Sequence, residues 1–200
     1  AIKKVVDNRE WLDLRNKYFV LLGATSAMGP LEILLKHGAN IIAVDLDRDV
    51  IWKKLIKKAR NSCGTLYIPV KRGAKESMQA KEKTDAFYDE LSKVSGCDLL
   101  CATPLIRNWI VDVHKNYLNG NEKLVIGNYT YLDGALHVQL SVACNAIING
   151  VASHLRRSSP SQPLIEQTQR PDAFAGFEVA VAKADPEWGP SPGSRDDRPG

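Results

Sequence analysis

The predicted fold rests mainly on residues 18–48, which read Y-F-V-L-L-G-A-T-S-A-M-G-P-L-E-I-L-L-K-H-G-A-N-I-I-A-V-D-L-D-R. Its first part, Tyr18–Leu22, is a continuous apolar run, which is typical of a strand covered on both faces. A turn bounded by glycines, Gly23–Gly29, follows and leads into a short helical pattern. A second apolar run, Asn40–Leu46, carries Asp45 near its end. The stretch therefore predicts strand, glycine turn, helix and strand, the order of a parallel β-α-β unit.

The same alternation continues to about residue 157. Helical apolar patterns recur at Asp49–Arg60, Thr84–Val94, Leu105–Leu118 and Leu136–Leu155. Strand-like apolar runs recur at Gly64–Val70, Cys97–Thr103 and Lys123–Tyr131. Because β-α-β crossovers pack helices against a sheet, we expect an α/β fold. The expected sheet is doubly wound and mostly parallel, in the order 3-2-1-4-5, with helices on both faces.

Composition divides the chain into three parts. Residues 1–17 form a helical extension, residues 18–157 form the sheet domain, and residues 158–200 form an irregular extension rich in Pro and Gly. Within the last part, Phe177–Ala182 alternates in polarity and can add one strand. The remaining tail buries too little apolar area to order itself, so we expect residues 171–200 to dock onto a protein partner.

Composition also narrows the functional classes. A formal net charge of +4 is too mild to indicate a nucleic-acid binder. No apolar run reaches the roughly 18 residues that cross a bilayer, so we expect a chain that does not span a membrane. The four cysteines show no C-x-x-C spacing, so we expect reduced thiols and a reducing intracellular compartment. The chain starts at Ala1 rather than Met, which fits a processed terminus or a piece of a longer chain. We therefore expect an organelle (plastid or mitochondrion) or the cytoplasm, and not secretion.

The glycine turn indicates a nucleotide crevice. Its backbone can approach a pyrophosphate, and the following helix start offers free N–H groups and a positive dipole end. Asp45 lies where a carboxylate accepts hydrogen bonds from the ribose hydroxyls of NAD, whereas Arg48 nearby suits the 2′-phosphate of NADP. The crevice either holds NAD or NADP, with NAD favoured by Asp45, or stands empty. The candidate cofactor-binding residues are Gly23, Thr25, Ser26, Ala27, Met28, Gly29, Asp45 and Arg48. No metal site is expected.

Over about residues 18–157 the chain resembles the short-chain dehydrogenase/reductase superfamily. The family turn is Gly-x-x-x-Gly-x-Gly, and Gly23 and Gly29 match its first and third glycines. Ala27 replaces the middle glycine, and its added methyl crowds the approach of a phosphate. The resemblance implies a Rossmann-like, NAD(P)-binding fold.

The catalytic part of that family is absent. The resemblance implies a Tyr-x-x-x-Lys pair on the helix after the fifth strand, but residues 136–155 contain neither Tyr nor Lys. Tyr129 and Tyr131 are the remaining candidates for a proton donor. Asp133 and His137, four residues apart, form either a helix cap or an acid/base dyad. Catalytic activity is uncertain, and the missing pair favours a protein that is not an enzyme.

Two functions remain open. The first is a catalytically inactive, dehydrogenase-like accessory or scaffold subunit of a larger assembly, which can be an organellar respiratory or photosynthetic one. The second is an atypical NAD(P)-dependent oxidoreductase or epimerase. In the first case the lysine-rich helix Asp49–Arg60 is a docking face for a protein partner, and association with the periphery of a membrane complex is open. That helix is otherwise a solvated face, or binds an anionic membrane surface.

Overall fold

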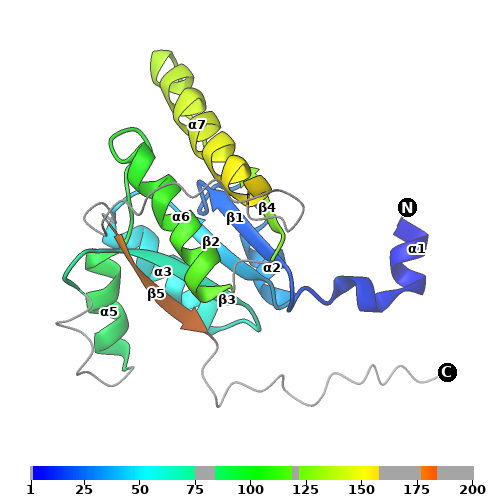
Figure 1. The fold of residues 1–200 in the computed structure, drawn as a ribbon. Helices are drawn as coiled ribbons and strands as arrows, with labels where there is room; N and C mark the ends of the chain where they lie inside the picture. Colours follow the sequence, from blue (N-terminus) through cyan, green and yellow to red (C-terminus); the bar gives the residue numbers. More distant parts are fainter. Residues whose placement is uncertain (1, 75–83, 119–121, 158–176, 184–200) are drawn as a thin grey trace.

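The computed structural model describes residues 2–74, 84–118, 122–157 and 177–183. It shows an α/β domain with one five-stranded, mostly parallel sheet in the order β4-β1-β2-β3-β5 (Figure 1). The parallel strands are β1 (Tyr18–Leu22), β2 (Asn40–Val44), β3 (Thr65–Lys71) and β4 (Leu124–Asn128). The fifth strand, β5 (Phe177–Lys183), runs antiparallel to β3 at one edge.

Helices cover both faces of this sheet. One face carries α2 (Leu31–Lys36), α3 (Asp49–Arg60) and α5 (Asp85–Val94). The other face carries α6 (Thr103–Tyr117) and α7 (Ala135–Arg157), which pack on each other. Alternate residues of β1 enter the two cores: Leu21 packs with the first set of helices, and Val20 and Leu22 with the second. This alternation is the period of two that a strand buried on both faces requires.

The expected order is confirmed for β3-β2-β1, but the expected strand at Cys97–Thr103 is wrong. Asp98 accepts hydrogen bonds from the backbone N–H groups of Leu100 (2.7 Å) and Cys101 (3.2 Å), which bends the chain into a turn. Helix α6 then begins at Thr103. The apolar run is buried as expected, since Cys97 and Leu99 lie in the core, but it is buried as a turn. Without that strand, β4 pairs directly with β1.

The alternating segment expected near residue 177 does add a strand. All seven residues of β5 pair with β3, from Phe177 opposite Lys71 to Lys183 opposite Thr65. Part of the extension expected at 158–200 is therefore an edge strand of the domain. The rest of that extension, at 158–176 and 184–200, lies outside the described residues.

The N-terminal extension is helical, as expected, but only in part. It holds α1 (Ile2–Asp7) and a short 3₁₀ helix, η1 (Arg9–Leu12). Trp11 and Leu12 are exposed, and only Leu14 packs against the core. The segment extends away from the rest of the domain (Figure 1).

Helix α7 is the longest element, and its start extends beyond the rest of the domain (Figure 1). Among the described residues it is the one helix long and apolar enough to cross a membrane, judged by length and composition only. One side of α7 belongs to the core, through Leu140, Cys144, Ile147 and Val151. Its other side leaves Leu136, Val138 and Val142 exposed.

Candidate ligand site at the carboxyl end of the sheet

The candidate site lies where the chain reverses its direction of winding. From β1 the chain proceeds to β2 and β3, and it later returns to β4 on the other side of β1. In an open α/β sheet, the loops that leave two such neighbouring strands separate and leave a crevice for a ligand. Here the two loops are the glycine turn after β1 and residues 129–134 after β4.

These two loops touch. Gly23 has φ +77°, and a Cβ built on it would lie 3.0 Å from the backbone nitrogen of Thr130. The backbone N–H of Tyr129 donates to the carbonyl of Leu22 at 2.8 Å. The first glycine of the turn therefore admits the chain's own β4 loop, in the place where the sequence suggested a phosphate.

Most backbone donors of the turn are used within the protein. The N–H groups of Gly23 and Ala24 donate to the carbonyl of Val44, at 2.9 and 3.2 Å. The N–H groups of Ser26 and Gly29 donate to carbonyls inside the turn, those of Gly23 and Ser26. Helix α2 begins only at Leu31, after Pro30, which has no N–H to offer.

Asp45 is the buried polar centre of this end of the sheet. It is 7% exposed, and one carboxylate oxygen accepts from both the backbone N–H and the hydroxyl of Thr25, each at 2.7 Å. Its second oxygen accepts from the N–H of Leu46 at 2.9 Å. A buried carboxylate needs such donors to offset its loss of hydration. We call the bonds that join Asp45 to Thr25 the Thr25–Asp45 latch, because they tie the turn after β1 to the end of β2.

A second segment, Gly96–Cys97, contacts Asp45 and also bonds to β3. The N–H of Cys97 donates to the carbonyl of Asp45 at 2.9 Å. Burial, followed by the charge of Asp45, raises the pKa of the Cys97 thiol, which keeps it protonated. Gly96 has φ +106° and lies so close to Asp47 and the indole of Trp52 that a Cβ there would overlap both. That indole in turn donates to the carbonyl of Leu46 at 2.8 Å.

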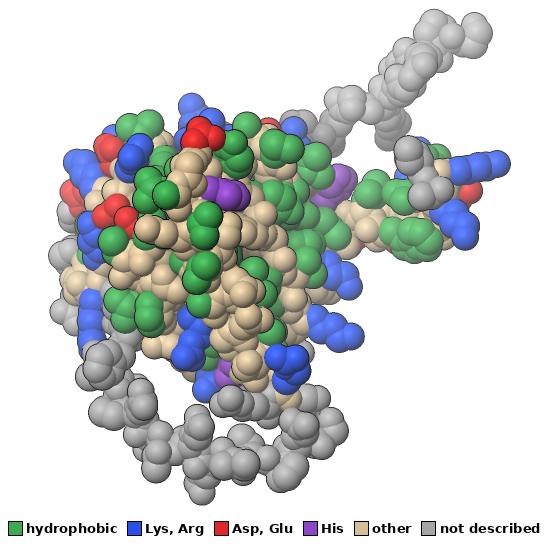
Figure 2. Space-filling view, turned by 90° about the horizontal axis from the view of Figure 1, so that it is seen from above, with side chains coloured by type: hydrophobic (Ala, Val, Ile, Leu, Met, Phe, Trp, Pro, Cys, Tyr) green, Lys and Arg blue, Asp and Glu red, His purple; other side chains and the backbone are tan. Residues whose placement is uncertain are grey.

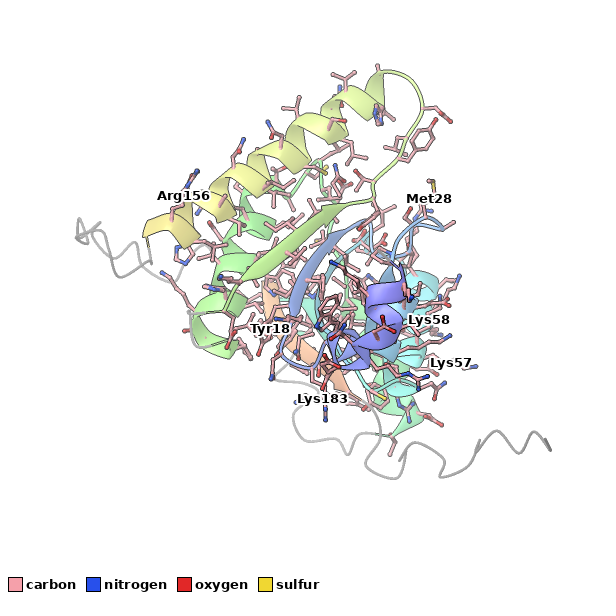
Figure 3. All side chains as sticks on the ribbon, turned by 90° about the vertical axis from the view of Figure 1, so that its right-hand side faces the viewer. Tyr18, Met28, Lys57, Lys58, Arg156 and Lys183 are labelled. Atoms are coloured by element: carbon pink, nitrogen blue, oxygen red, sulfur yellow. The ribbon has the colours of Figure 1, made fainter. Side chains whose placement is uncertain are left out.

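The remaining turn residues and Arg48 face outward. Ala27 is exposed, and Met28 is 91% exposed, with its side chain directed away from the domain (Figure 3). Arg48 is exposed and precedes α3, where its carbonyl accepts from Ile51 and Trp52. The eight candidate cofactor residues therefore divide between inward groups that bond to one another and outward groups on the surface.

The two candidate tyrosines lie in different surroundings. Tyr129 packs its ring against the backbone of Gly127, where a Cβ would lie 2.4 Å from the ring, and it belongs to the edge of the core. Tyr131 is 75% exposed, donates to the carboxylate of Asp133 at 2.9 Å and lies beside the ring of His137. The contact of Tyr131 with Asp133 and His137 is thus a surface cluster at the start of α7.

Several residues that form this end of the sheet were not identified from the sequence. Thr130 bonds to Asn128 through its hydroxyl at 2.7 Å and lies 3.5 Å from the sulfur of Cys144. Gly96 and Cys97 complete the cover over Asp45. A glycine ahead of a buried cysteine is too common a pair to have been a signal. Across the described ranges, His, Cys, Asp and Glu side chains form no group of three or more that holds a metal ion.

No family model, curated protein or solved structure matches the chain.

Proposed function

We propose that the chain is a catalytically inactive, dehydrogenase-like Rossmann protein that serves as an accessory or scaffold subunit in a larger protein assembly. In this proposal, the glycine turn and Asp45 hold the sheet together in place of binding NAD or NADP. The observation that carries it is the Thr25–Asp45 latch, because the carboxylate suited to a ribose already accepts three hydrogen bonds from its own chain.

The absence of a proton-transfer pair on α7 supports this proposal. Catalysis of the kind found in short-chain dehydrogenases would need a tyrosine whose pKa is lowered by a nearby cation. The exposed Tyr131 bonds to a carboxylate, and α7 carries no lysine. Helix α7 therefore lacks both the tyrosine and the lysine that the resemblance implies for proton transfer.

The surface of α7 supports a role in assembly. From Gly134 to Ser153 the sequence contains no Lys, Arg, Asp or Glu, although Leu136, Val138 and Val142 are exposed. Figure 2 views the molecule from the side on which α7 begins and shows hydrophobic side chains gathered there, with many Lys and Arg toward the rim. Exposed apolar surface of this kind is typical of contacts with another macromolecule.

The proposal is tested on the protein isolated from its own cells under native conditions. We expect it to migrate as part of a stable complex, and to show no NAD(P)H oxidation with carbonyl substrates. A single free chain, or turnover that Tyr131→Phe abolishes, would contradict the scaffold role.

A further inference from the structure

Helix α3 has two cationic sides, which differ in how many of their cations pair with a carboxylate. Toward α5, Lys53 lies 3.6 Å from Asp89, and Arg60 lies 2.7 Å from Asp85. Arg60 also lies over the ring of Tyr88, at 4.2 Å from its centroid. This side of α3 therefore finds its counter-charges within the domain.

The side of α3 that faces α2 encloses a hollow of about 310 Å³. We call it the α2–α3 groove; its lining residues are Glu32, Leu35, Lys36, Lys54, Lys57, Lys58, Asn61 and Ser62. Leu35 lies at the base of this groove, but it is only 1% exposed and belongs to the core. Lys57 and Lys58 project from α3 toward the outside of the molecule (Figure 3).

The groove carries four lysines and one carboxylate. Glu32 pairs with Lys58, and this hydrogen bond is the main cause that lowers the pKa of Glu32. The charges of Lys36 and Lys54 lower that pKa further, so they act on the same point. Within the described residues, Lys36, Lys54 and Lys57 have no carboxylate within 4.0 Å. The groove thus stabilises the carboxylate of Glu32, and three further ammonium groups are available to pair with carboxylates of a partner.

The types of side chain that line the groove indicate which class of anionic partner it binds. The lining contains no arginine, which is the residue that binds phosphates in a bidentate manner, and no aromatic ring on which a base would stack. Lysines act as point charges, and the pair of Lys58 with Glu32 shows a carboxylate held among them.

We propose that the α2–α3 groove binds an acidic peptide segment of a partner protein, with glutamate or aspartate side chains on Lys36, Lys54 and Lys57. This inference deepens the scaffold role, since it names the chemistry of a partner. Peptide binding is measured separately from nucleotide binding and native size, so a failure here is distinguishable from a failure of the scaffold role.

The test measures fluorescence anisotropy of a labelled peptide rich in glutamate. The whole chain is titrated in low salt. A Lys54→Gln/Lys57→Gln variant is compared with Lys53→Gln/Lys183→Gln, which removes two lysines outside the groove. We expect the groove variant to lose about fivefold in affinity, as for two exposed ion pairs, and the control variant to stay within about twofold. Added salt should weaken binding to the wild type.

Four results would overturn the proposal. The first is equal loss in both variants, which would mean that only net charge matters. The second is equally tight binding of the same peptide with glutamine in place of glutamate. The third is no saturation at millimolar peptide. The fourth is displacement of the peptide by single-stranded DNA or by phosphatidylserine vesicles at lower concentrations than the unlabelled peptide, which would assign the groove to another class of partner.

Discussion

Two regions differ in whether their charged groups have partners within the protein. One is the carboxyl end of strands β1 and β2, and the other is the α2–α3 groove. Asp45 is buried, and its carboxylate accepts three hydrogen bonds from the chain itself. In the groove, Lys36, Lys54 and Lys57 are exposed and have no carboxylate within 4.0 Å among the described residues. From this difference we infer that the residues with the clearest motif stabilise the fold, and we propose that the residues available for binding lie in an ordinary lysine-rich helix.

The largest expected effect follows from removing the buried carboxylate. Asp45→Ala leaves the N–H and hydroxyl of Thr25 and the N–H of Leu46 without their acceptor, so we expect a loss of about 3–4 kcal/mol in the free energy of unfolding. Asp47→Ala is the matched control. Asp47 is half-exposed and pairs with Lys71 at 3.4 Å, so its loss should cost well under about 1 kcal/mol. Urea unfolding measures both, and equal costs would show that Asp45 has no special structural role.

The contact between the two loops is tested at glycines. Gly23→Ala meets both a positive φ and the backbone of Thr130, whereas Gly134→Ala meets a positive φ (+68°) with nothing within 4 Å. We expect Gly134→Ala to cost about 1 kcal/mol and Gly23→Ala about 2 kcal/mol more. Urea unfolding gives the free energy that each variant loses, and the difference between the two losses measures the contact of Gly23 with Thr130. A difference near zero would mean that the crevice is open at Gly23.

A smaller effect is expected from the hydroxyl of Thr25. Thr25→Val keeps the backbone donor to Asp45 and removes the hydroxyl donor, so it should cost about 1–2 kcal/mol. In a double-mutant cycle with Asp45→Ala the two costs should be less than additive by about 1 kcal/mol. Additive costs would refute the latch.

The smallest effect is expected in the groove. Lys54→Gln/Lys57→Gln removes exposed charges that have no close counter-charge, so the free energy of unfolding should stay within about 0.5 kcal/mol of the wild type. The same urea measurement checks this value. A loss of more than about 1 kcal/mol would show that these lysines stabilise the fold, and would remove the contrast with Asp45.

The sequence predicts the β-α-β unit at residues 18–48 because its strands are buried on both faces and its turn is marked by glycines. It does not predict the turn at residues 97–102. Burial produces the same apolar pattern in a strand and in a turn, and only the side chain of Asp98 makes the difference. Thr25 and Asp45 are both visible as site residues, but twenty positions separate them. Whether that carboxylate faces a ligand or a neighbouring hydroxyl depends on packing that no local pattern records.

The central claim is that the glycine turn and Asp45 stabilise the fold in place of binding a dinucleotide. Isothermal titration of the whole chain with NAD⁺, NADH, NADP⁺ and NADPH tests it most directly. We expect no saturable heat up to millimolar nucleotide, in the wild type and in Asp45→Asn alike. Saturable binding to the wild type that Asp45→Asn abolishes, in a variant that remains folded, would contradict it.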